Sequence, residues 1–255
     1  MNHAEPQLAV RGLDVTVAGR TLVARLALTI RAGQTTVVLG CNGSGKTLCL
    51  LSLAGLRGAS AAAVMLGGKA RDSLSRREVA RLLSFMPQDS GTEVVGTVLD
   101  FVTLGLYPWQ GGGAAESGAD QERTLAALQR LELADKAQQE VASLSGGERR
   151  RLDLALLLVQ RTSLWLLDEP TNHLDPAQQA VLLGLLREHR AAGGGALVSL
   201  HDPSLAADIA DQVLLLSGDG RWECGSPQDM LGLERLSLLY HTPLVRLPGF
   251  RPQAR

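Results

Sequence analysis

The residues best suited to chemistry in this sequence form a glycine-rich loop between positions 40 and 47. Every fixed position of the phosphate-loop pattern G-x-x-x-x-G-K-[ST] is matched. Such a loop turns successive backbone N–H groups toward a polyphosphate. We expect Lys46 to reach the β- and γ-phosphates and the Thr47 hydroxyl to ligate Mg²⁺. The predicted phosphate-binding residues are Gly40, Cys41, Asn42, Gly43, Ser44, Gly45, Lys46 and Thr47.

This loop needs a strand before it and a helix after it, and the flanking sequence predicts both. Residues 35–39 are a short, partly β-branched apolar run, typical of a buried strand. Residues 48–54 are apolar on all sides and predict a buried helix. Because strand, loop and helix follow in the required order, phosphate binding is favoured over a glycine-rich turn that happens to precede a lysine.

Two adjacent carboxylates follow a second apolar run, at residues 163–167. In phosphate-loop enzymes an aspartate at this place holds the Mg²⁺ shell, which is the role we expect for Asp168. Glu169, one residue further, can polarise a water in line with the γ-phosphate and act as general base. The alternative is two acidic residues that cap the next turn.

Two more polar side chains, Gln88 and His201, also come directly after apolar runs. In open α/β sheets, ligands bind beyond the carboxyl ends of the strands. We therefore expect one edge of the sheet to gather Gly40, Gln88, Asp168, Glu169 and His201.

Residues 144–148 read Leu-Ser-Gly-Gly-Glu. Ser145 suits a helix N-cap and the glycines suit a loop, which is one explanation of the segment. However, Arg149, Arg150 and Arg151 then occupy the first helical turn, where the helix dipole repels cations. We expect an anion from outside the segment to offset that repulsion.

Taken together, the motifs resemble those of the ATP-binding subunits of ABC transporters, across essentially the whole chain. The resemblance is carried by the phosphate loop, Gln88 in Met-Pro-Gln, the signature at 144–148, Leu-Leu-Asp-Glu-Pro at 166–170 and its continuation to Asp175, and His201 in Ser-Leu-His-Asp.

The resemblance implies an ATPase that forms an ATP-dependent, head-to-tail homodimer with two ATP molecules at its seam. Each ATP would be held by one subunit's phosphate loop and by Ser145 and Gly147 of the other. Asp175 would act across the seam, and His201 would contact the γ-phosphate. Gln88 would sense Mg²⁺, water and the membrane partner. Lys46, Gln88, Glu169 and His201 would be the catalytic residues, and Mg²⁺ would be held by Thr47, Gln88 and Asp168.

The sequence departs from the family at the position that would contact the adenine base. The aromatic residue that stacks on adenine should lie near Val17, where only aliphatic residues occur. Looser discrimination among nucleoside triphosphates is therefore implied. Glu148 also replaces the commoner glutamine of the signature.

Residues 97–108 look like the segment after the glutamine loop in bacterial importers of siderophores, haem and cobalamin, although Leu106 stands where a basic residue is common. The resemblance implies separate integral membrane permease subunits and, through them, a substrate-binding protein. The chain would then lie peripherally on the cytoplasmic face of the bacterial inner membrane. Alternatives are an exporter ATPase, a soluble ABC ATPase outside transport, and a binder that does not hydrolyse ATP.

An apolar, aromatic cluster, Tyr107-Pro108-Trp109, predicts a contact surface for the membrane partner. The alternative is that Trp109 folds back onto its own chain.

Composition bounds these expectations. The net charge of −1 gives no electrostatic footprint for nucleic acid. No run approaches the roughly 18 uncharged residues that span a bilayer. Three cysteines without a C-x-x-C pair imply neither a disulfide framework nor a zinc site, so we expect a reducing, cytosolic setting. The first residues do not predict a secretion signal.

The fold expected for all 255 residues is a single α/β nucleotide-binding domain with a phosphate-loop (RecA-like) core. Residues 8–17 and 22–30 predict an N-terminal antiparallel β layer. Later strands alternate with helices, which predicts a mostly parallel sheet. Residues 89–160 are predicted to be an inserted helical subdomain.

Overall fold

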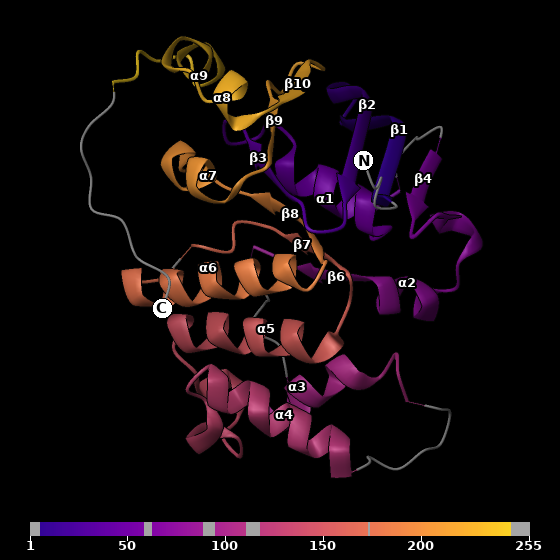
Figure 1. Cartoon of the computed structure of the whole chain (residues 1–255), viewed down its shortest axis with the longest axis vertical. Helices are drawn as coiled ribbons and strands as arrows, with labels where there is room; N and C mark the ends of the chain where they lie inside the picture. The colour runs from indigo at the N-terminus through magenta and orange to yellow at the C-terminus, as the bar shows by residue number, and fades with distance from the viewer. Residues whose placement is uncertain (1–5, 59–62, 89–94, 111–117, 173, 246–255) are drawn as a thin grey trace.

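The computed structural model describes residues 6–58, 63–88, 95–110, 118–172 and 174–245. Its strands form two sheets, and Figure 1 shows how they are arranged. The first is antiparallel, in the order β2-β1-β4-β5, and its long hairpin turns at Ala18 and Gly19, whose positive φ angles of 47° and 79° suit a tight two-residue turn. Its strands are β1 (Pro6–Val17), β2 (Arg20–Arg31), β4 (Ala63–Leu66) and β5 (Lys69–Ala70).

The second sheet has the order β10-β9-β3-β8-β7-β6 and is parallel except for β10. Parallel strands need crossover connections, which the helices between them supply. The predicted α/β class, with its mostly parallel sheet and N-terminal antiparallel layer, is confirmed. The strands are β3 (Thr35–Leu39), β6 (Leu83–Met86), β7 (Leu164–Leu167), β8 (Gly195–Ser199), β9 (Gln212–Leu216) and β10 (Trp222–Gly225).

The central strand β3 is buried on both faces, and its side chains alternate between two hydrophobic cores. Val38 points into the core that it shares with Leu50 of helix α1 and with the antiparallel sheet. Val37 points into the other core, together with Leu152 and Leu182 from the helices on the opposite side. The phosphate loop, which follows β3, is therefore anchored on a strand that packing fixes from both sides.

The longer helices of the described residues fall on both sides of this sheet. Helices α3, α4 and α5 come between β6 and β7 in the chain and pack on one another, at the opposite end of the molecule from β1, β2 and α9 (Figure 1). The helices are α1 (Lys46–Ala54), α2 (Arg76–Leu82), α3 (Val98–Thr103), α4 (Gly118–Arg130), α5 (Gly146–Gln160), α6 (Pro176–Ala191), α7 (Pro203–Ile209), α8 (Pro227–Met230) and α9 (Leu233–Leu239).

Helices α3 to α5 lie within the predicted subdomain of residues 89–160, whose first residues, 89–94, are outside the described part of the chain. Their apolar side chains join those of the main sheet in one continuous core. The boundaries of a separate subdomain stay a prediction.

Candidate active site

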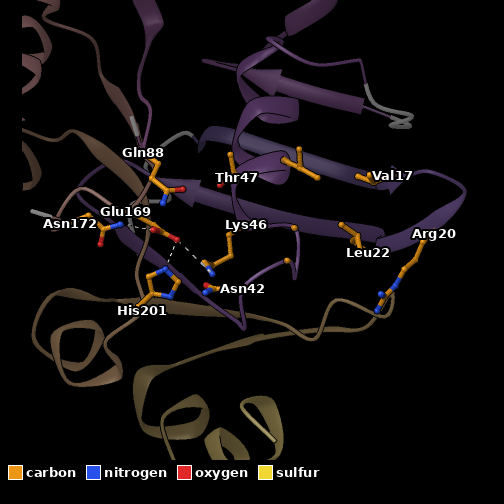
Figure 2. A pocket seen from close by; sticks show the side chains of 13 residues that line it. Val17, Arg20, Leu22, Asn42, Lys46, Thr47, Gln88, Glu169, Asn172 and His201 are labelled. Atoms are coloured by element: carbon orange, nitrogen blue, oxygen red, sulfur yellow. Dashed lines mark hydrogen bonds and ion pairs between the residues drawn. The ribbon is translucent and has the colours of Figure 1, made fainter. Parts of the chain in front are cut away.

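A cavity of about 710 Å³ opens at the carboxyl ends of β3, β6, β7 and β8, and side chains that follow each of these strands line it. Figure 2 shows how Lys46, Gln88, Glu169 and His201 point into it from different segments of the chain. The full lining is Val17, Arg20, Leu22, Asn42, Gly43, Gly45, Lys46, Thr47, Leu48, Gln88, Glu169, Asn172 and His201.

The phosphate loop takes a conformation that requires glycine. Gly43 and Gly45 have φ angles of 78° and 99°, in the left-handed region that glycine adopts most readily. At Gly40 a Cβ atom would lie 2.5 Å from the Leu216 carbonyl oxygen and 2.5 Å from the Ser44 hydroxyl. Helix α1 begins directly after Gly45, with no side-chain cap and no acidic residue in its first turn. Its N-terminal N–H groups and dipole can therefore bind an anion in the cavity.

Lys46 is buried, with 5% of its surface exposed, and its ammonium group has three oxygen neighbours. It donates to the carbonyls of Gly40 at 2.9 Å and Cys41 at 3.3 Å, and it lies 3.9 Å from Glu169 Oε1. Burial lowers the pKa of Lys46, while Glu169 and Asp168 act in the opposite direction. A phosphate would add the negative charge that stabilises this buried ammonium.

The carboxylate of Glu169 is buried and held at both oxygens. His201 Nε2 lies 2.5 Å from Oε1, and Asn172 Nδ2 donates to Oε2 at 2.6 Å (Figure 2). The side chain is thereby aimed at the cavity, next to Lys46. A carboxylate fixed in this way can accept a proton from a water without first reorienting.

The backbone of Glu169 is strained, because its φ angle of 46° lies in the left-handed region, which L-residues other than asparagine and aspartate rarely occupy. Two contacts hold it there. Its N–H donates to Ser199 Oγ at 2.8 Å, and its carbonyl accepts from the Arg150 guanidinium at 2.9 Å. The residue that faces the cavity is thus held in a strained conformation by its neighbours.

Asp168 follows β7 directly and is fully buried. Its Oδ1 accepts a hydrogen bond from Ser199 Oγ at 2.6 Å, but Oδ2 has no partner among the described residues. The buried hydroxyl of Ser44 in the phosphate loop also lacks one. Because buried polar atoms are nearly always paired, these two oxygens are suited to ligands that the protein itself does not supply.

Some predicted site residues do not line this cavity. Gly40, Cys41, Ser44 and Asp168 belong to segments whose other residues do line it, whereas Ser145, Gly147 and Asp175 lie at the starts of α5 and α6. Ser145 caps α5 in a reciprocal box with Glu148, whose pKa is lowered to about 2, chiefly by Lys136 and also by hydrogen bonds from Ser145. Asp175 caps α6. Within one chain these residues therefore lie at the starts of two helices.

The expectation that an outside anion compensates the three arginines is wrong for the middle one. Arg150 is 5% exposed, and its guanidinium donates to backbone carbonyls at the ends of two strands. These carbonyls belong to Pro87 at 2.7 Å, Asp168 at 3.1 Å, Glu169 at 2.9 Å and Pro170 at 3.2 Å. Dipoles of the chain itself, together with the buried Asp153 carboxylate 3.6 Å from Nη1, therefore compensate this charge.

Sequence reasoning missed Arg150, Ser199 and Asn172 as residues of the site. Arg150 and Ser199 act on backbone atoms or on a buried carboxylate, and Asn172 acts on the second oxygen of Glu169. The only signal in the sequence was the unusual run of arginines at a helix start. It indicated that their positive charge must be compensated but did not identify the compensating groups.

At the other end of the cavity from His201, Figure 2 shows Val17, Leu22 and Arg20. The aliphatic side chain of Val17 stands at the position where the family resemblance implied a missing aromatic residue. The surface that could contact a nucleotide base here consists of aliphatic side chains and the Arg20 guanidinium. Arg20 Nη2 donates to the Gly218 carbonyl at 3.1 Å.

Fold and cavity together define an ATPase of the phosphate-loop class. A family model described as "ABC transporter" matches residues 23–172. The chain belongs to this family, whose ATP-binding subunits hydrolyse ATP to drive transport.

Relatives of known name support the assignment. The hemin import ATP-binding protein HmuV of Streptomyces coelicolor is 36% identical over 96% of this chain and 87% of its own length. A Bacillus subtilis protein named "Probable siderophore transport system ATP-binding protein YusV" is 35% identical over 88% of this chain and 82% of its own. A solved chain titled "An inward-facing conformation of a putative metal-chelate type ABC transporter" is 27% identical, with a TM-score of 0.79 over 94% of this chain and 90% of that one.

Proposed function

We propose that this chain powers the import of a metal chelate, such as haem or a ferric siderophore, through a separate membrane permease. The named relatives and the metal-chelate type structure support this substrate class. The observation that carries the catalytic part is the buried Glu169 carboxylate, held by His201 and Asn172 beside Lys46. A protein that only binds ATP has no need of such a group.

In the proposed reaction, Lys46 and the start of α1 bind the β- and γ-phosphates of ATP. Glu169 takes a proton from a water as the water oxygen bonds to the γ-phosphorus. The bond from the γ-phosphorus to its bridging oxygen breaks, and ADP and phosphate are formed. His201 holds Glu169 in place and contacts the γ-phosphate.

We assign the Mg²⁺ site to Thr47, Gln88 and Asp168. The unpaired Asp168 Oδ2 fits this role, since hard cations prefer carboxylate, hydroxyl and amide oxygens. When bound, Mg²⁺ supplies charge that neutralises the phosphate oxygens. Ser199, which donates to Asp168 Oδ1, leaves Oδ2 as the oxygen available to it.

Two chains would pair head to tail around two ATP molecules. The position of Ser145, Gly147 and Asp175 supports this pairing, because none of the three lines the cavity of its own chain and all three lie at the starts of helices. Each would serve the ATP bound by the partner chain. A substrate-binding protein would take part only through the permease.

The permease would contact Gln88 and the α3 region of the proposed 89–160 subdomain. Tyr107 is 73% exposed there and is free to contact a partner. Trp109 is 44% exposed, and its own chain covers the rest: its Nε1 donates to Gln160 O at 2.8 Å, and the Arg81 guanidinium lies 5.5 Å from its ring centroid. No helix of the described residues is long and apolar enough to cross a membrane. We place the chain on the cytoplasmic face of the bacterial inner membrane.

The test is ATP-driven uptake by proteoliposomes that contain the chain and its permease, with haem and with ferric siderophores outside and ATP inside. Uptake of one of these chelates that disappears with Glu169→Gln supports the proposal. ATP-dependent movement in the opposite direction, or ATPase activity that no membrane subunit alters, would contradict it.

A further inference from the structure

The C-terminal end of α9 contacts the active site at two separate places. The backbone carbonyl of Leu239 accepts a hydrogen bond from the Cys41 thiol of the phosphate loop at 3.3 Å. The hydroxyl of the next residue, Tyr240, lies 3.5 Å from the backbone carbonyl of His201. Neither contact is accounted for by the roles assigned so far.

These contacts complete a closed ring of interactions. The carbonyl of Cys41 accepts from Lys46, Lys46 faces Glu169, and Glu169 contacts the imidazole of His201. His201 then leads through its carbonyl to Tyr240, which is bonded to Leu239. The three groups that act on the γ-phosphate are thus linked on one side through side chains and on the other through the end of α9.

The end of α9 is well placed to bear on both loops. Leu239 is only 7% exposed, and Tyr240 packs against the same core that holds the sheet. The last carbonyls of a helix have no partner within it, so the Cys41 thiol satisfies one that would otherwise be unpaired. Burial raises the pKa of Tyr240 to about 12, which keeps its hydroxyl a donor at neutral pH.

We propose that the end of α9 is a brace: through Cys41 and Tyr240 it holds the phosphate loop and the His201 loop at the spacing that hydrolysis requires. Both are positioning residues. Lys46 and His201 sit on different loops, so a small shift of one relative to the other would misalign the water and the γ-phosphate. Catalysis is sensitive to such shifts, whereas phosphate affinity depends mainly on the loop's own N–H groups.

The test compares Tyr240→Phe and Cys41→Ala in the full chain, with Cys41→Ser as the conservative variant. Steady-state hydrolysis of MgATP gives kcat, and titration with a non-hydrolysable ATP analogue gives affinity. We expect kcat to fall by about fivefold in each of the first two, the scale of one lost hydrogen bond. Affinity should change by less than about twofold, and Cys41→Ser should recover most of the rate.

Leu238→Ala is the matched control, because Leu238 lies on the same helix but is 72% exposed. Its kcat should equal that of the parent. Thermal unfolding of every variant identifies any loss of folding. Parental kcat in both Tyr240→Phe and Cys41→Ala would overturn the brace, and so would equal falls in kcat and affinity.

The brace rests on the proposed function, in which Glu169 is the general base. Glu169→Gln distinguishes a failure of the brace from a failure of that assignment. If Glu169→Gln loses activity while Tyr240→Phe and Cys41→Ala keep it, the brace alone fails. If Glu169→Gln retains parental activity, the assigned general base is wrong.

Discussion

Cys41 is the thiol of this chain that stands in the active site, and the other two are protected. Burial raises the pKa of Cys49 to about 12 and that of Cys224 to about 11, so both are almost fully protonated at neutral pH. Thiolates, not thiols, react with alkylating agents. Cys41 is partly exposed at the phosphate loop.

We therefore expect maleimide reagents to modify Cys41 before the other two and to block ATP binding by their bulk. Peptide mass spectrometry would locate the label, and saturating ATP should slow its attachment. Unchanged nucleotide affinity after complete modification of Cys41 would mean that phosphate does not bind against this loop.

Arg150 is a buried arginine whose guanidinium donates to four backbone carbonyls at the ends of β6 and β7. Arg150→Lys keeps the charge but cannot reach four carbonyls with one ammonium. Buried carbonyls without donors cost about 1–3 kcal/mol each, so the free energy of unfolding should fall by about 2–4 kcal/mol. Urea denaturation would measure it. Arg76→Lys, at an exposed arginine of α2, should change it by less than about 0.5 kcal/mol.

The sequence predicted that Lys46, Gln88, Glu169 and His201 meet at one site, and they line one cavity, because their types and spacing follow from what a polyphosphate requires. It did not locate Arg150 or Ser199, because a side chain that binds backbone carbonyls or a neighbouring carboxylate leaves no pattern of its own. Only the three-dimensional structure shows which carbonyls the Arg150 guanidinium contacts.

At the scale of elements, α6 and β7 are joined by a stacked pair of rings. His189 and Trp165 have centroids 3.8 Å apart and planes inclined by 6°, and His189 Nε2 lies 3.2 Å from Gly195 O. A Cβ on Gly194 would lie 2.2 Å from the imidazole, so only glycine leaves room for this packing. The turn into β8 is therefore fitted around the histidine.

This pair gives folding stability a pH dependence. Burial lowers the pKa of His189, partly offset by the Gly195 carbonyl, so the folded chain holds the imidazole neutral at a pH where the unfolded chain protonates it. Stability should then fall as pH drops below about 6.5, the unfolded value, until the lower folded pKa is passed. Measurements of the free energy of unfolding from pH 7.5 to 5 should show a shallower decline in His189→Phe. An identical slope in both proteins would exclude His189 as the source.

Element types were predictable where apolar runs were short and ended at a glycine or a polar residue, as at β3, which ends before Gly40, and at β7, which ends before Asp168. The order β10-β9-β3-β8-β7-β6 was not, because β3 and β7 are each hydrogen-bonded to β8, which follows both in the sequence. Local patterns carry no information on which distant strands will be neighbours.

For the whole molecule, the proposed pairing predicts a state that can be trapped. Glu169→Gln keeps the size and hydrogen bonding of the side chain but removes its basicity, so hydrolysis should fall by about 10² or more. ATP binding should survive, and the variant should elute from gel filtration as an ATP-bound dimer.

Lys46→Ala is the matched control, since it should bind ATP poorly and elute as a monomer at the same protein concentration. A Glu169→Gln chain that hydrolyses ATP at the parental rate would mean that another residue is the general base, with His201 the next candidate. A Glu169→Gln chain that binds ATP yet stays monomeric would contradict the head-to-tail pairing.

The Arg150 side chain also connects α5 to the segments that follow β6 and β7. It stands in the first turns of α5, the helix that Ser145 caps, and donates to the carbonyls of Pro87 and Pro170 in the segments that follow β6 and β7. Those segments carry Gln88 and Glu169, so a rotation of α5 must carry both with it or break several buried bonds at once. In a head-to-tail pair, α5 starts at one nucleotide while Glu169 serves the other. Arg150 would then couple the two nucleotide sites, because a movement of α5 at one site would also move Glu169 at the other.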